Sequence, residues 1–160
     1  INLLANLNYK VVALTNKDEK FLTKLGAASI IKRDNFNYSK NPLSKQKWQG
    51  AIDTVGGEIL STILAETMYD GIVVSTGLAK SATLNTTVYP FILRNITLSG
   101  IDCVYASYKK RVNAWKFLEK YLDKRILKKI KVTKSFNDLH DISNQILKGE
   151  IRGRTLIKVV

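Results

Sequence analysis

Short apolar runs and segments of helical periodicity alternate along the chain. The runs KVVALT, AIDTV and IVVS are short and mostly apolar, which is typical of buried parallel strands. Two of them lead into the small residues Thr54-Val55-Gly56-Gly57 and Ser75-Thr76-Gly77, which is how parallel strands end where they face a bound ligand. The segments between them place apolar residues at every third or fourth position and predict amphipathic helices. We expect strands at 10–15, 29–32, 51–55, 72–75, 96–101 and 155–160, with a further candidate at 130–133, and helices at 1–7, 17–25, 58–68, 90–95, 107–124 and 139–147.

This alternation predicts an α/β fold with a doubly wound, mostly parallel, Rossmann-type sheet. Such sheets begin with a strand and a turn of the form G-x-G-x-x-G, and we expect both to lie upstream of Ile1. The usual strand order, 3-2-1-4-5-6, places that first strand in the middle of the sheet. We therefore expect that the strands at 10–15 and 51–55 do not pair with each other, and that the edges that would flank the first strand are unpaired. We expect the strand at 96–101 to lie at an edge of the sheet.

Composition narrows the class of protein. A chain of 160 residues with 45% apolar content is suited to one domain. The sequence contains no run of about 18 apolar residues, so we expect no membrane-spanning helix and no membrane partner. Its single cysteine fits a reducing cytoplasm. A net charge of +13 favours phosphate-bearing ligands or nucleic acid. Because the lysines are spread along the chain, we favour solvated helix faces with one phosphate site over a nucleic-acid partner.

The residues after the first visible strand bear on cofactor choice. In a dinucleotide fold this position faces the adenosine ribose, where a carboxylate accepts the 2′-hydroxyl of NAD. This chain has Thr15, Asn16 and Lys17 instead, which suit the 2′-phosphate of NADPH. The alternative is structural, with Thr15 or Asn16 capping the helix that starts at Lys17. Farther along, Asp53 follows a buried strand, and we expect it to position loop backbone.

Four segments carry a resemblance to a known family: GAIDTVGG, STGLA, TTVYPFILRNITLSGID and GRTLIKVV. They resemble the medium-chain dehydrogenase/reductase superfamily, in the zinc-free quinone oxidoreductase branch that includes NADPH-dependent acryloyl-CoA reductase. The resemblance implies the cofactor-binding part of an enzyme that transfers hydride from NADPH to a quinone or an α,β-unsaturated acyl-CoA. It implies a partial NADPH-binding domain at 1–125 and a segment at 126–160 that returns toward a catalytic domain upstream. The alternative is a basic, non-enzymatic Rossmann-like module that binds nucleic acid or a protein partner.

The resemblance also implies roles for individual residues, although the catalytic residues stay unknown. Lys17 would clamp the 2′-phosphate with support from Arg33, and Leu78 would pack beside the nicotinamide. Core packing is the alternative for Leu78 and for Ile92, and a small buried hydrophobic side chain is the alternative for Cys103. The expected cofactor-binding residues are Thr15, Asn16, Lys17, Arg33, Leu78, Ile92, Cys103 and Arg154, with no metal ligands. We further expect a homodimer that pairs through the edge strand at 96–101.

Overall fold

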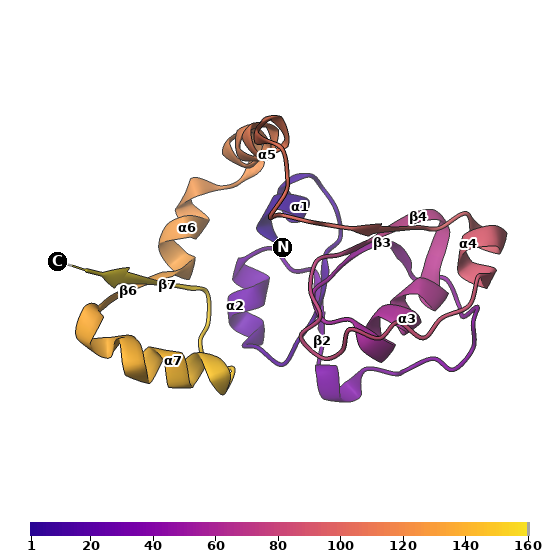
Figure 1. Cartoon of the computed structure of the whole chain (residues 1–160), viewed down its shortest axis with the longest axis horizontal. Helices are drawn as coiled ribbons and strands as arrows, with labels where there is room; N and C mark the ends of the chain where they lie inside the picture. Colours follow the sequence, from indigo (N-terminus) through magenta and orange to yellow (C-terminus); the bar gives the residue numbers. More distant parts are fainter. Residues whose placement is uncertain (160) are drawn as a thin grey trace. The chain divides into compact units, whose positions relative to one another are not determined.

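The computed structural model describes residues 1–159, and these form two compact units. Unit 1 consists of residues 1–36 and 109–160, and unit 2 consists of residues 37–108. Figure 1 shows the elements of both units in chain order. Each unit is described on its own below.

The N-terminal part of unit 1 is a short βαβ element. Helix α1 (Asn2–Asn6) precedes strand β1 (Val12–Leu14), which is followed by α2 (Glu19–Lys24) and β2 (Ser29–Ile31). β1 and β2 are parallel, with Ala13 opposite Ile30. Asp18 caps α2, since its carboxylate accepts the backbone N–H of Phe21 at 2.6 Å. The helix therefore begins at Glu19, and the prediction that Thr15 or Asn16 caps it is wrong.

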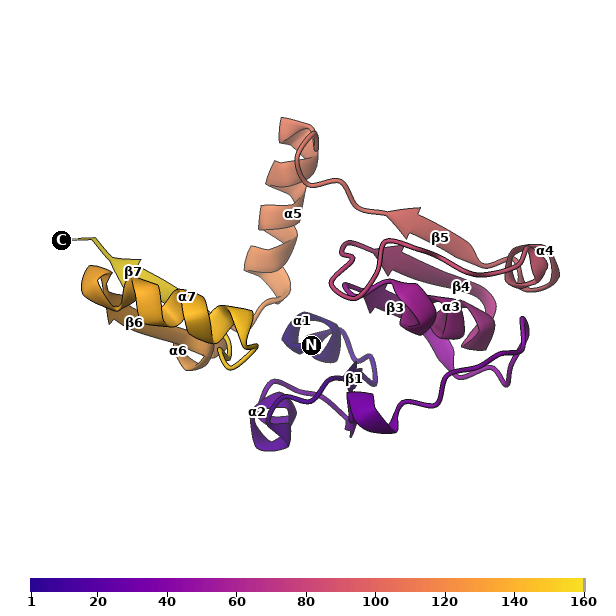
Figure 2. The ribbon, with the colours of Figure 1, turned by 60° about the horizontal axis from the view of Figure 1, so that its bottom comes forward.

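The C-terminal part of unit 1 contains the elements α5 (Tyr108–Tyr121), α6 (Lys124–Ile130), β6 (Lys131–Ser135), α7 (Leu139–Leu147) and β7 (Arg154–Lys158). β6 and β7 pair in parallel, and α7 connects them and runs alongside them in both views (Figures 1 and 2). Ile126 of α6 and Ile142 of α7 are buried. The last expected strand reaches Val160, which lies outside the described residues.

Unit 2 is a three-stranded parallel sheet with one long covering helix. Its elements are β3 (Trp48–Asp53), α3 (Gly57–Glu66), β4 (Thr67–Ser75), α4 (Tyr89–Arg94) and β5 (Thr97–Gly100). The strand order is β3-β4-β5, and Figure 2 shows the three strands with α3 against them. Leu60 and Leu64 of α3 pack with Val73 and Ile96 of the sheet to form the core. This apolar contact holds α3 against the sheet, and so fixes the position of the helix relative to the carboxyl ends of the strands.

One ion pair and one set of hydrogen bonds connect the chain at the amino ends of the same strands. Glu66, at the end of α3, is 4% exposed and accepts the Lys47 ammonium at 2.5 Å and the Trp48 indole N–H at 3.0 Å. The Arg94 guanidinium donates to the carbonyls of Ala65 (2.8 Å), Ser44 (2.6 Å) and Thr67 (3.2 Å). A cation at this position is favourable because the last carbonyls of a helix lack partners within it. The carboxyl ends of the strands, where the candidate site lies, are at the opposite end of the sheet.

The strand arrangement confirms the parallel α/β fold. Within the described residues, β1 pairs only with β2, β3 pairs only with β4, and β5 pairs only with β4 at a sheet edge. The one regular helix missing from the prediction is α6, because its sequence KRILKKI carries four basic residues and little apolar periodicity.

Candidate functional site

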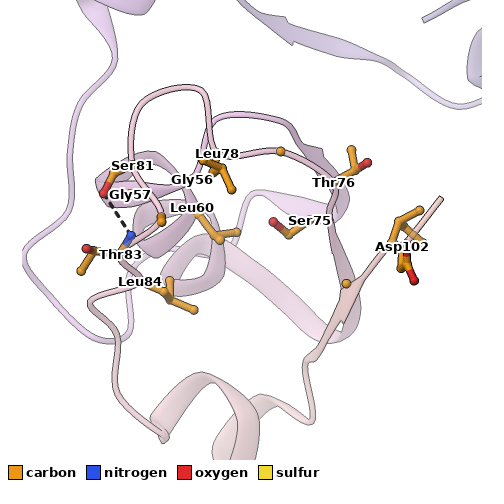
Figure 3. Close-up of a pocket in the computed structure, with 14 residues that line it drawn as sticks. Gly56, Gly57, Leu60, Ser75, Thr76, Leu78, Ser81, Thr83, Leu84 and Asp102 are labelled. Carbon is orange, nitrogen blue, oxygen red and sulfur yellow. Dashed lines mark hydrogen bonds between the residues drawn. The ribbon is translucent and has the colours of Figure 1, made fainter. Parts of the chain in front are cut away.

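A cavity of about 570 Å³ opens at the carboxyl ends of β4 and β5 in unit 2. Its walls come from the turn after β3, the first turn of α3, the loop 76–84 and the residues that follow β5 (Figure 3). Leu60, Leu78 and Leu84 give it an apolar lining, and Ser75, Thr76 and Ser81 add hydroxyl groups. Ligands of open α/β sheets bind at this edge.

Two glycines bring the backbone of opposite walls close together. Gly56 has a positive φ of 72°, and a Cβ added there would lie 2.1 Å from the carbonyl oxygen of Ser81. A Cβ at Gly77 would lie 2.6 Å from the carbonyl oxygen of Thr54. Any side chain at either position would push the two loops apart. The glycines thus set the width of the cavity on this side.

Asp53 holds the turn that contains Gly56. Its side chain is buried, with 3% of the residue exposed. The carboxylate accepts the backbone N–H groups of Val55 (3.1 Å) and Gly56 (3.0 and 3.1 Å) and the hydroxyl of Ser75 (3.4 Å). The prediction that Asp53 positions loop backbone is confirmed. The same side chain also links the ends of β3 and β4 beneath the cavity.

The loop 76–84 is bound to this turn along most of its length. The N–H of Thr76 donates to the carbonyl of Asp53 at 2.9 Å, and that of Lys80 donates to Val55 at 2.9 Å. The ammonium of Lys80 lies 4.8 Å from the Tyr38 ring centroid and 3.5 Å from the Glu58 carboxylate. A hydrogen bond from this ammonium to the Tyr38 hydroxyl, more than the Glu58 charge, raises the pKa of Lys80. The loop that forms one wall of the cavity is therefore anchored at both its backbone and a side chain.

The residues expected to face the adenosine ribose form a second cluster, in unit 1. The Asn16 side chain accepts the backbone N–H of Arg33 at 2.8 Å and donates to the Asp34 carboxylate at 3.1 Å. The Thr15 hydroxyl accepts the backbone N–H of Lys17 at 3.2 Å. The structure thus brings together four of the expected residues, Thr15, Asn16, Lys17 and Arg33, and adds one carboxylate that the prediction did not include.

Lys17 reaches the C-terminal segment of the same unit. Its ammonium donates to the carbonyl of Gly149, and to that of Ile151 at 3.0 Å. An ammonium group has three donors, so one N–H stays available to an anion. The two carbonyls hold the charge in place beside the turn after β1.

The other expected binding residues are not gathered at one place. Leu78 lines the cavity and is 66% exposed, while Ile92 lies on α4 and is 69% exposed, so core packing is wrong for both. Cys103 is exposed, and the alternative of a small buried side chain is also wrong. It follows Asp102, whose carboxylate accepts the N–H groups of Val104 and Tyr105 just after β5. Arg154 is an exposed residue at the start of β7 in unit 1.

The sequence reading missed several residues of the cavity wall. Asp102, Ser81 and Leu84 line it. The position of Asp102 directly after an apolar strand was the available signal. Within residues 1–159, no cluster of three or more His, Cys, Asp or Glu side chains is placed to hold a metal ion, and no helix is long and apolar enough to cross a membrane.

Comparison with known proteins identifies the family. The model of the zinc-binding dehydrogenase family matches residues 1–120. This chain belongs to that family. The match agrees with the resemblance to medium-chain dehydrogenases/reductases that the sequence motifs carry.

Individual proteins of known fold or function are also similar to this chain. Acrylyl-CoA reductase AcuI from Ruegeria pomeroyi is 38% identical over 160 residues, which are 98% of this chain and 48% of that protein. The crystal structure of Escherichia coli K-12 YhdH with bound NADPH superposes with a TM-score of 0.93 at 40% identity, covering 100% of this chain and 50% of the other. Bacillus subtilis YhfP with NAD bound gives a TM-score of 0.91 at 36% identity, covering 99% and 49%. The chain therefore spans about half the length of these relatives, and their folds confirm the Rossmann-type architecture.

Proposed function

We propose that this chain is the cofactor-binding part of an NADPH-dependent oxidoreductase that transfers hydride to an electron-poor acceptor. The observation that carries the proposal is the cavity at the carboxyl ends of β4 and β5, whose walls come together because Gly56 and Gly77 let neighbouring loops pack closely. A cavity with a mainly apolar lining and a few hydroxyl groups suits a flat ring that carries a polar substituent.

Each unit, taken by itself, contains residues that fit one end of NADPH. The cavity in unit 2 offers an apolar floor at Leu60 and hydroxyl groups at Ser75 and Thr76, which suit a nicotinamide with its carboxamide. In unit 1, Lys17 and Arg33 supply cations beside the turn after β1, which suit a 2′-phosphate. When bound, NADPH supplies the hydride, and this chain orients the ring, keeps water from its apolar face and fixes the loops around it.

We propose a quinone or an α,β-unsaturated acyl thioester such as acryloyl-CoA as the acceptor. The Ruegeria relative is an acrylyl-CoA reductase, and the Bacillus relative has the name of a quinone oxidoreductase. Both acceptor classes take hydride at an electron-poor carbon or oxygen, and both need the negative charge that develops on oxygen to be stabilised. We propose that the groups for that step lie in the half of the relatives that this chain does not match, and that residues 126–160 return toward it. The single cysteine supports a cytoplasmic enzyme.

We also propose a homodimer that pairs through β5. The N–H of Ile101 donates inward to the carbonyl of Ser75 at 2.9 Å. Because successive residues of a strand direct their N–H groups to opposite sides, Leu98 presents its N–H at the open edge. Tyr89, in the helix α4 that precedes β5, is 47% exposed. A two-fold axis would let the two copies of β5 pair with each other.

Cofactor binding tests the proposal directly. NADPH fluorescence is titrated with this chain, with NADH as the matched ligand, and reduction of acryloyl-CoA and of a benzoquinone is then measured on the full-length protein with the preferred cofactor. We expect NADPH to bind more tightly than NADH, and one acceptor to be reduced. Absence of binding to either cofactor, together with salt-sensitive binding to nucleic acid, would instead support a basic non-enzymatic module.

A further inference from the structure

The net charge of the chain is divided very unequally between the two units. Residues 37–108 contain five basic and five acidic side chains, so unit 2 is neutral and the net charge of +13 belongs entirely to unit 1. The cavity lies wholly in the neutral unit. Its own electrostatics therefore depend on which of these few charges are close to it.

The basic residues of unit 2 with described contacts are bound to other groups, and none of them lines the cavity. Lys47 pairs with Glu66 at 2.5 Å, and Lys80 pairs with Glu58 at 3.5 Å, so each pair offsets its own charges. Arg94 is bound to three carbonyls at the other end of α3. Along the part of the chain that the structure describes, no lysine or arginine lines the cavity.

Two carboxylates are left near the cavity without a cation. Asp102 is the one charged residue among those that line it (Figure 3). Its Oδ1 accepts the N–H groups of Val104 at 2.7 Å and Tyr105 at 3.3 Å. Asp53 lies beneath it, bonded to two of its lining groups, the Gly56 N–H and the Ser75 hydroxyl. Among residues 1–159, neither carboxylate takes part in a salt bridge.

We propose that this cavity selects for positive charge on the ring it holds, and so binds the oxidised, pyridinium form of the nicotinamide more tightly than the reduced, neutral form. The inference rests on the proposed function. Uncompensated carboxylates attract a cation and leave a neutral ring almost unaffected. Tighter binding of the oxidised form lowers the midpoint potential of the bound cofactor. The reduced cofactor is then a stronger hydride donor, and the oxidised product is slower to leave.

Asp102→Asn isolates the charge from the shape of the site. An asparagine Oδ1 accepts the same two backbone N–H groups, so the turn after β5 is retained. Dissociation constants for NADP⁺ and NADPH are measured by calorimetry and fluorescence on the full-length protein. Because Asp102 is exposed and partly screened, we expect NADP⁺ binding to weaken by about 3- to 5-fold, with NADPH binding unchanged within error. Asp70→Asn is the matched control, since Asp70 is an exposed carboxylate of unit 2 that does not line the cavity.

A salt series on the unmodified protein gives a second measurement that needs no variant. NADP⁺ and NADPH carry the same phosphates, so salt weakens the phosphate contacts of both forms equally. This common effect drops out of the ratio of their dissociation constants. We expect the preference for NADP⁺ to narrow as salt rises from about 0.02 M to about 0.5 M. An unchanged ratio in Asp102→Asn, or an equal loss for both forms, would overturn the inference while leaving the proposed function intact. Failure of the unmodified protein to bind either form would overturn both.

Discussion

Replacing Lys17 with alanine tests the assignment of the 2′-phosphate site. The ammonium is held by the carbonyls of Gly149 and Ile151, which leaves one donor for a phosphate oxygen. A hydrogen bond to a charged group contributes about 1.5–3 kcal/mol, and the lower end applies here because Lys17 is only half-buried. That value corresponds to a loss of about 10-fold in affinity for NADPH.

The same substitution also releases the C-terminal segment, and that effect acts on both cofactors. The informative quantity is therefore the ratio of the dissociation constants for NADPH and NADH, measured by fluorescence titration. We expect Lys17→Ala to lower the preference for NADPH by about 10-fold. Lys17→Arg should retain it, because a guanidinium binds phosphate at least as well.

Lys24→Ala provides the control for net charge. Lys24 is an exposed residue in the last turn of α2, in the same unit as Lys17. We expect its loss to leave the cofactor ratio unchanged. Equal losses of NADPH and NADH binding in Lys17→Ala, or the same change in both variants, would refute the phosphate assignment.

Three further substitutions test the cavity and the sheet edge. Gly56→Ala should lower the free energy of unfolding by at least about 2 kcal/mol in urea denaturation, because its Cβ would meet the Ser81 carbonyl at 2.1 Å; a stability equal to that of the unmodified protein would contradict the geometry. Asp53→Ala should cost about 1–3 kcal/mol by leaving buried N–H groups without an acceptor, whereas Ser75→Ala, which removes one 3.4 Å contact, should cost clearly less. Leu98→Pro should convert a dimer into monomers in light scattering, and a folded variant that stays dimeric would argue against pairing through β5.

The elements that the sequence predicted well are those whose own residues determine them. The apolar run at β1 and the periodic segment of α7 need no distant partner to be recognised, and Gly26, with a φ of 100°, ends α2 as expected. α6 escaped prediction because most of its residues are basic, and only Ile126 is buried. Formation of this helix therefore depends on packing against other parts of the chain, which its own sequence pattern does not indicate.

The candidate site was predictable only in part, for a related reason. Glycine and small residues after β3 and β4 indicated a ligand at the strand ends, and Leu78 indeed lines the cavity. The neighbours of Lys17 could not be predicted, because no local pattern connects residue 17 to residues 149 and 151. The exposure of Cys103 could not be predicted either, because it lies beyond the end of β5, where the apolar strand pattern has stopped.

The contact between Lys17 and the C-terminal segment has a consequence for biosynthesis. Its two acceptors lie 132 and 134 residues downstream, while the strands of unit 2 are separated by short crossovers. During translation, the walls of the cavity can be assembled while the ribosome is still adding α5. The turn beside Lys17 acquires its carbonyl partners only after residue 151 has left the exit tunnel. A nascent chain should therefore complete the proposed nicotinamide site of unit 2 before the proposed 2′-phosphate site of unit 1.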